Sequence, residues 1–216
     1  MAIVPTYRCN MLCSHCGMSN FPMDTDMSLE TYKKALDFFS ARKKEFISLS
    51  GGEPTLHENI IEMLMLSFPK FDKVIFNTNG KGTAVMNKLI KLSESKNLYI
   101  NLSIDKYHEP IDEEVVRKFK KDKTQKLVIR RVVSDLALQG RNTDKTGGIL
   151  PCICQDLIVQ PNGDVALCGC EDAFILGNVH TQVKMPMYYN HFKCTKEYTL
   201  RIEQGLFKEE DIWSKE

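Results

Sequence analysis

The sequence lacks several features that would place it in a specialised class of protein. It has no apolar run approaching the roughly 20 residues of a membrane-spanning helix, and it does not open with a secretory signal pattern. Its 29 Lys and Arg balance 28 Asp and Glu, a net charge of +1. The strong positive surplus typical of nucleic-acid-binding domains is absent, so nucleic acid stays open as a partner without being favoured. The sequence predicts a cytoplasmic protein with no membrane association.

Cysteine, by contrast, is plentiful, with eight in 216 residues. Because no secretory signal is present, we expect these thiols to be reduced and to bind metal rather than form disulfides. Cys9, Cys13 and Cys16 are spaced C-x3-C-x2-C directly after a first apolar run. Three thiolates on one loop can hold three irons of a cubic cluster and leave the fourth iron open to an outside ligand. A structural zinc site, the alternative, usually has paired C-x2-C units or histidines at set distances, so the spacing favours an iron-sulfur cluster.

Strand-like and helix-like segments alternate up to about residue 135. The predicted strands are residues 2–7, 46–50, 73–77, 98–104 and 127–133, and the predicted helices are residues 28–39, 60–68, 85–92 and 113–119. Strict alternation implies right-handed crossovers and a parallel sheet. About five such units are too few to close an eight-stranded barrel. The expected fold is therefore α/β, a partial (β/α)5-6 barrel of the TIM type over residues 1–141.

Active sites in such sheets lie at the carboxyl ends of the strands. The cysteine loop and the segments 51–54, 77–80 and 103–108 each follow a predicted strand, so we expect them to meet at one edge. Gly51 and Gly52 would let the backbone approach a ligand closely. Taken alone, the same residues could be a glycine-rich turn before a helix, with Glu53 as an acid in its first turn.

Two motifs resemble the signatures of the radical S-adenosylmethionine (SAM) superfamily: the C-x3-C-x2-C loop, with His15 directly before its last cysteine, and the Gly51-Gly52-Glu53 stretch. The resemblance implies that the loop cysteines hold a [4Fe-4S] cluster whose open iron chelates the methionine part of SAM. It also implies that Gly51, Gly52 and Glu53 contact SAM and that His15 lies near the adenine. One electron would cleave SAM to methionine and a 5'-deoxyadenosyl radical, which takes a hydrogen atom from the substrate. A donor such as flavodoxin or ferredoxin would supply that electron.

The same resemblance implies cofactor contacts for further residues at strand ends. Ser103 and Asp105 lie two apart in the fourth predicted strand, so they share a face, and they would hydrogen-bond the ribose of SAM. A strand-end cap or an Asx turn is the alternative for this pair. Asn77 and Asn79 would line the same cavity, although a turn at this position explains them almost as well.

Four other residues near this edge are candidates for the cofactor or the substrate. Arg130 and its neighbour point to opposite faces of the fifth predicted strand, so at most one reaches the cavity, where Arg130 could pair with a carboxylate. Tyr107, His108 and Glu109 are candidate catalytic residues that would face the substrate. The alternative for these three is a solvated loop.

A second group of cysteines surrounds a predicted hairpin in residues 149–216, the expected second unit. The turn 161–163 suits a three-residue loop with Gly163 in the left-handed conformation, which pairs Gln160 with Asp164. This register sets four cysteines on one face, whereas a two-residue turn would split them. They are Cys152, Cys154, Cys168 and Cys170.

This segment resembles the SPASM and twitch auxiliary-cluster segments of radical SAM enzymes. Their C-x9-15-G-x4-C pattern matches Cys152, Gly163 and Cys168, and C-terminal helices would close the unit. The resemblance implies a second [4Fe-4S] cluster held by at most four of five candidate cysteines, the fifth being Cys194. A zinc hairpin and buried structural cysteines are the alternatives.

The expected function is that of a radical SAM enzyme, and the auxiliary segment favours modification of a peptide side chain. A nucleotide, a nucleic-acid base or a small molecule remains an alternative substrate. A different class is a non-catalytic iron-sulfur electron carrier or sensor. Such a protein would have no reason to place Gly51-Gly52-Glu53 and the Ser103/Asp105 pair beside its cluster.

Overall fold

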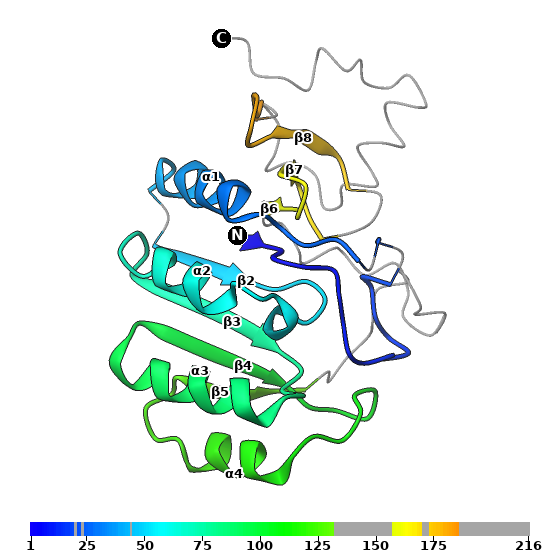
Figure 1. Cartoon of the computed structure of the whole chain (residues 1–216), viewed down its shortest axis with the longest axis vertical. Helices are drawn as coiled ribbons and strands as arrows, with labels where there is room; N and C mark the ends of the chain where they lie inside the picture. The colour runs from blue at the N-terminus through cyan, green and yellow to red at the C-terminus, as the bar shows by residue number, and fades with distance from the viewer. Residues whose placement is uncertain (20, 23, 44, 132–156, 170–172, 186–216) are drawn as a thin grey trace.

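The structure is a computed structural model that describes residues 1–19, 21–22, 24–43, 45–131, 157–169 and 173–185. Its strands form one sheet in the order β5-β4-β3-β2-β1-β6-β7-β8, and helices α1 to α4 lie over one side of that sheet (Figure 1). The elements are β1 (Ala2–Ile3), α1 (Leu29–Ser40), β2 (Phe46–Leu49), the 3-10 helix η1 (Pro54–Leu56), α2 (Ile60–Ser67), β3 (Lys73–Thr78), α3 (Thr83–Ser95), β4 (Leu98–Ser103), α4 (Glu113–Lys121), β5 (Leu127–Arg130), β6 (Ile158–Val159), β7 (Asp164–Ala166) and β8 (Ile175–Asn178).

Alternating burial along the strands explains the layers. Leu49 of β2, Phe76 of β3 and Ile100 of β4 are fully buried on the face that carries the hydrophobic core. Their neighbours Asn77 and Asn101, on the opposite face, are half-buried and polar. The sheet therefore has one face sealed by helices and one polar face that remains partly accessible.

The parallel part of the sheet confirms the predicted partial barrel. Neighbouring strands from β1 to β5 pair in parallel, in the order of the chain. Helix α1 begins where predicted, because the Ser28 hydroxyl accepts a hydrogen bond from the Thr31 backbone N–H at 3.0 Å. The first predicted strand is shorter than expected: regular pairing ends at Ile3, and Thr6 makes only an isolated bridge to Asp26.

The hairpin has the predicted register. Ile158 pairs with Ala166, the Gln160 N–H donates to the Asp164 carbonyl at 2.8 Å, and Gly163 has a φ of 90°. The two-residue alternative is wrong. The sequence did not predict that β6 would also pair in parallel with β1, which joins the hairpin to the main sheet. The proposed boundary between residues 141 and 149 falls outside the described residues.

Among the described residues, no helix is both long and apolar enough to cross a lipid bilayer.

Candidate functional site

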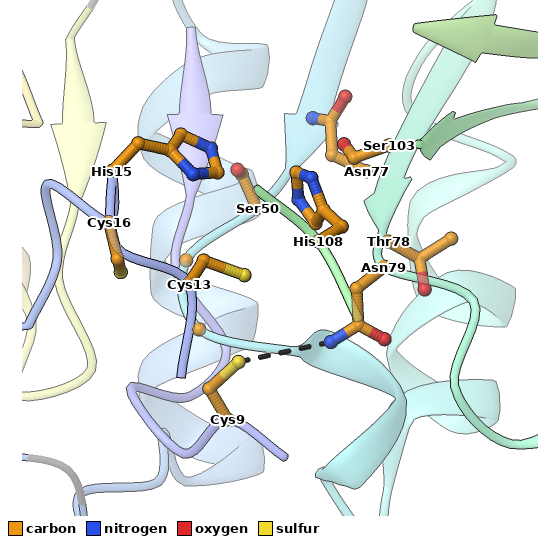
Figure 2. A pocket seen from close by; sticks show the side chains of 12 residues that line it. Cys9, Cys13, His15, Cys16, Ser50, Asn77, Thr78, Asn79, Ser103 and His108 are labelled. Carbon is orange, nitrogen blue, oxygen red and sulfur yellow. Dashed lines mark hydrogen bonds between the residues drawn. The ribbon is translucent and has the colours of Figure 1, made fainter. Parts of the chain in front are cut away.

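A cavity lies at the carboxyl ends of strands β2 to β4, beside the cysteine loop. In Figure 2 the three cysteines of the loop lie opposite residues that follow β3 and β4, and both histidine rings project toward the space between them. This is the edge at which the sequence predicts a site. The cavity is lined by Cys9, Cys13, His15, Cys16, Ser50, Gly51, Gly52, Asn77, Thr78, Asn79, Ser103 and His108.

The two glycines bring the backbone after β2 against the backbone before the cysteine loop. Gly52 N–H donates to the Thr6 carbonyl at 3.0 Å, and Glu53 N–H donates to the Arg8 carbonyl. A Cβ on Gly52 would lie 2.2 Å from the Arg8 carbonyl oxygen, and Gly51 has a φ of 130°, which side-chain-bearing residues rarely adopt. The chain therefore needs glycine at both positions to set the cysteine loop against the sheet edge.

An ion pair anchors the residues that lead into the cysteine loop. Arg8 contacts Asp26 through two nitrogens, at 3.0 and 2.6 Å, and also donates to the Leu56 carbonyl at 2.7 Å. The Thr6 hydroxyl donates to the same carboxylate. Burial opposes ionisation of Asp26, but the hydrogen bonds from Thr6 and Arg8 outweigh it and hold the pKa of this carboxyl below its usual value. The network ties the loop to two neighbouring segments.

Glu53 does not face the cavity. Its side chain is fully buried, and one oxygen accepts from the Thr55 N–H and hydroxyl and from the Thr78 hydroxyl, at 3.1, 2.6 and 2.8 Å. The other oxygen accepts from the Asn79 backbone N–H at 2.7 Å. Burial raises the pKa of Glu53, while these hydrogen bonds act against that rise. The carboxylate predicted to contact the cofactor instead organises the rim from behind.

Asn77, near the end of β3, and Asn79, directly after that strand, line the cavity as predicted, and each is held by a specific set of hydrogen bonds. Asn77 donates to the Ser48 hydroxyl at 2.7 Å and accepts from the Asn101 amide at 2.9 Å. These contacts form a polar chain across β2, β3 and β4 on the face of the sheet opposite helices α1 to α4. Asn79 donates to the Asn10 side chain at 2.9 Å and so contacts the cysteine loop directly.

Asp105 holds a histidine and is not among the cavity-lining residues, whereas Ser103 is. The Asp105 carboxylate accepts from the Tyr107 N–H at 2.9 Å and lies 2.8 Å from His108 Nδ1. The loop after β4 folds back on itself in an Asx turn, the alternative considered above, and Ser103 and Asp105 do not line the cavity together. His108 lines the cavity, and Tyr107 packs against the ring of His15 with centroids 4.8 Å apart.

His15 lies at the wall of the cavity. Its Nδ1 is buried and has no hydrogen-bond partner among the described residues. The His15 and His108 rings meet edge to face with centroids 5.0 Å apart. Burial, together with the neighbouring His108, lowers the pKa of His15. A buried polar nitrogen without a partner at a cavity wall is a natural contact for a bound ligand.

Glu109 and Arg130 are not among the cavity-lining residues. The Glu109 carboxylate is exposed, pairs with Lys81 Nζ and lies 3.4 Å from the Leu12 N–H, while Lys81 also donates to the Asn10 carbonyl at 3.0 Å. Glu109 and Lys81 therefore clamp the cysteine loop from outside. Sequence reasoning missed Lys81, because nothing in its local sequence shows that it meets a loop some 70 residues away. Arg130 pairs in register with Ser103, which puts it on the same face of the sheet, but it is exposed.

The second group of cysteines is described only in part. Cys168 is 1% exposed and packs with Ala166 and Ala173. The other four candidates, Cys152, Cys154, Cys170 and Cys194, lie outside the described residues.

The residues at the cavity fit an iron-sulfur cluster with SAM. Three partly buried thiols from one loop face the cavity, as three corners of a cubic cluster require. The backbone at Gly52 comes so close to the loop that no side chain fits, and His15 Nδ1 offers an unused polar atom. Burial raises the pKa of the Cys9 thiol, and the Asn79 amide and the Met11 backbone act against that rise. Coordination by iron would remove this thiol proton.

Several known proteins resemble this chain. The protein AlbA of antilisterial bacteriocin subtilosin biosynthesis from Bacillus subtilis is 31% identical over 111 residues, covering 49% of this chain and 24% of its own. The crystal structure of BtrN in complex with AdoMet (SAM) and 2-DOIA aligns with a TM-score of 0.67 at 18% identity, over 98% of this chain and 89% of that one. The structure of anSMEcpe with bound AdoMet and the Cp18Cys peptide aligns with a TM-score of 0.53 at 14% identity, over 85% and 78%.

At these identities the structural matches show the fold, which is a partial TIM barrel. The matched region makes up between 17% and 33% of the length of the curated relatives. A family model for the radical SAM superfamily matches residues 3–132, which include the cysteine loop, the glycine stretch and the strands that place them. Members of this family are enzymes, and the family implies a [4Fe-4S] cluster with SAM. This chain belongs to the radical SAM superfamily.

Proposed function

We propose that this chain is a radical SAM enzyme whose cluster is held by Cys9, Cys13 and Cys16. The observation that carries the proposal is the convergence of these thiols on a cavity with the glycine backbone after β2 and polar side chains after β3 and β4. When bound, the cluster and SAM supply reductive cleavage of SAM and abstraction of a hydrogen atom from the substrate. A non-catalytic electron carrier would need the thiols but not the remaining rim.

The chain's own residues bind and orient. The backbone at Gly51 and Gly52 would present polar groups to the methionine part of SAM, and His15 and Ser103, which line the same cavity, would contact its nucleoside part. The Asp105 carboxylate fixes the ring of His108 through Nδ1, which leaves the other ring nitrogen to face the cavity. His108 is the residue that we place against the substrate.

Anaerobic reconstitution tests the class of activity. The reduced protein should convert SAM to 5'-deoxyadenosine and methionine, and Cys13→Ala should abolish that product. Ser14→Ala is the matched control, because Ser14 is an exposed neighbour in the same loop. A protein with a full cluster that forms no 5'-deoxyadenosine would refute the proposed enzymatic activity. The non-catalytic electron carrier or sensor would then be the remaining interpretation.

For the substrate we propose a peptide side chain. Support comes from AlbA, a bacteriocin biosynthesis protein, and from the fold shared with anSMEcpe, which was crystallised with a peptide. A fraction of cell extract that stimulates 5'-deoxyadenosine formation should lose its effect after protease treatment. Stimulation that survives protease would contradict the peptide proposal. An electron donor such as flavodoxin or ferredoxin would deliver the electron.

A small molecule is the second candidate substrate, favoured by one observation. BtrN, whose fold matches almost the whole of this chain, was crystallised with 2-DOIA. The polar chain of Ser48, Asn77 and Asn101, on the face of the sheet opposite helices α1 to α4, suits a ligand with several hydrogen-bonding groups. Protease-resistant stimulation by the low-molecular-mass fraction would support this candidate. A nucleic-acid base as substrate predicts binding that weakens steeply with salt.

We also propose a second [4Fe-4S] cluster on the hairpin. The observed pairing of Gln160 with Asp164 supports it, because the sequence predicts from this register that the hairpin cysteines share one face. Reconstituted protein should then hold about eight irons per chain. A content of about four irons per chain would contradict the second cluster, and bound zinc would indicate a structural zinc site in its place.

A further inference from the structure

The side-chain amide of Asn79 points at the sulfur of Cys9. Its Nδ2 lies 3.8 Å from Cys9 Sγ, the contact drawn as a dashed line in Figure 2. The same nitrogen donates to Asn10 Oδ1 at 2.9 Å, so its two N–H groups are both directed at the cysteine loop. Asn79 is 7% exposed, which shields these contacts from water.

The orientation of this amide is determined by its neighbours. Asn79 Oδ1 accepts from the Lys81 backbone N–H at 2.8 Å, so the nitrogen must face the other way, toward Cys9. The Asn79 backbone N–H in turn donates to the fully buried Glu53 carboxylate at 2.7 Å. Glu53 thus fixes the residue whose amide meets the thiol, and a chain of contacts runs from a buried carboxylate to a cluster ligand.

We propose that Asn79 is a positioning residue that donates an N–H···S hydrogen bond to the Cys9 thiolate and thereby raises the reduction potential of the cluster, with Glu53 holding Asn79 in place. The inference rests on the proposed function in so far as it needs a cluster on Cys9. A donor to a thiolate ligand stabilises negative charge at the sulfur. Reduction adds an electron to the cluster, so the reduced form gains more from the bond than the oxidised form.

Removing the hydrogen bond should lower the reduced-to-oxidised ratio of the cluster about fivefold at a fixed solution potential. This fold-change corresponds to about 1 kcal/mol, the net strength of an ordinary hydrogen bond, or to a shift of about 41 mV for a one-electron couple. The potential is measured by a redox titration followed by electron paramagnetic resonance, on the full chain reconstituted without SAM. Iron and sulfide content is measured on each sample.

Asn79→Leu removes the donor while keeping the size of the side chain, and it should lower the potential by about this amount. Asn79→Asp keeps the acceptor for the Lys81 N–H and replaces only the donor, so it should lower the potential further. Asn77→Leu is the matched control, since Asn77 lines the same cavity but donates to Ser48 and the Leu49 carbonyl. In this variant the reduced-to-oxidised ratio at a fixed solution potential should stay within about twofold of the wild-type ratio.

The wild-type part of a spectroscopic measurement does not depend on how well the variants fold. In wild-type protein labelled with ¹⁵N-asparagine, pulsed electron paramagnetic resonance should detect a side-chain nitrogen coupled to the reduced cluster, and Asn79→Asp should remove it. Absence of that coupling, an unshifted potential in Asn79→Leu with full iron content, or an equal shift in Asn77→Leu would each overturn this proposal alone. Failure of the wild type to assemble any cluster would overturn the proposed function as well.

Discussion

Replacing Gly52 with alanine should displace the cysteine loop. The new Cβ would lie 2.2 Å from the Arg8 carbonyl oxygen and 2.5 Å from the Tyr7 carbonyl oxygen. Both of these atoms belong to the backbone, so no side chain can rotate to make room. The segment that they form leads directly into Cys9, and the displacement therefore reaches the first cluster ligand.

The size of the effect follows from the distances. An ordinary carbon-to-oxygen contact needs roughly 3.2 Å or more, so the two backbones must separate by about 1 Å. Overpacking of this kind costs about 1–3 kcal/mol, which for a chain of this size lowers the melting temperature by roughly 2–12 °C. A displacement of about 1 Å at a reacting group can cost about a hundredfold in rate. Activity should therefore fall more than stability.

Thermal unfolding of the cluster-free chain and the rate of 5'-deoxyadenosine formation measure the two effects. Gly169→Ala is the control for stability, because its Cβ would meet only the end of the Ile158 side chain, at 3.1 Å. That variant should stay within about 0.5 kcal/mol of the wild type. Wild-type stability together with wild-type 5'-deoxyadenosine formation in Gly52→Ala would refute the close approach of these backbones.

Other predictions concern the anchor, the first helix and the hairpin. Because the folded pKa of Asp26 lies below its ordinary 3.8, its carboxylate stabilises the fold above that pH and loses the effect as the pH falls through the folded value. Asp26→Asn should then lower the free energy of unfolding at pH 7, measured by urea titration. It should also weaken the fall of that free energy at acid pH, and an unchanged fall would contradict the reasoning. Ser28→Ala removes the cap of α1 and should cost about 1 kcal/mol; an unshifted urea midpoint would show that the cap contributes nothing. Gly163 has a φ of 90°, so Gly163→Ala should lower the free energy of unfolding by about 1–2 kcal/mol and speed hydrogen exchange at the Gln160 amide. Unaltered exchange at this amide would argue against the need for glycine in the turn.

Much of the fold was predictable because its signals are local. The alternation of strands and helices depends on side-chain periodicity within each segment, and the register of the hairpin depends on its three-residue turn, where Gly163 takes the left-handed conformation. The pairing of β6 with β1 was not predictable in this way. It joins residues some 156 apart, and no short pattern in the sequence specifies which edge of the sheet a distant strand will meet.

The sequence by itself determined the cysteine loop and the glycine stretch. The spacing of the ligands and the positions without a Cβ both depend only on residues that are close together in the sequence. Only the tertiary structure decided what the charged groups around them do. Glu53 turns inward to hold Asn79, Asp105 holds His108, and Glu109 pairs with Lys81 outside the cavity. A carboxylate at a strand end can face a ligand, its own loop or a neighbouring loop. Which of these it faces depends on where the partners from other elements come to lie.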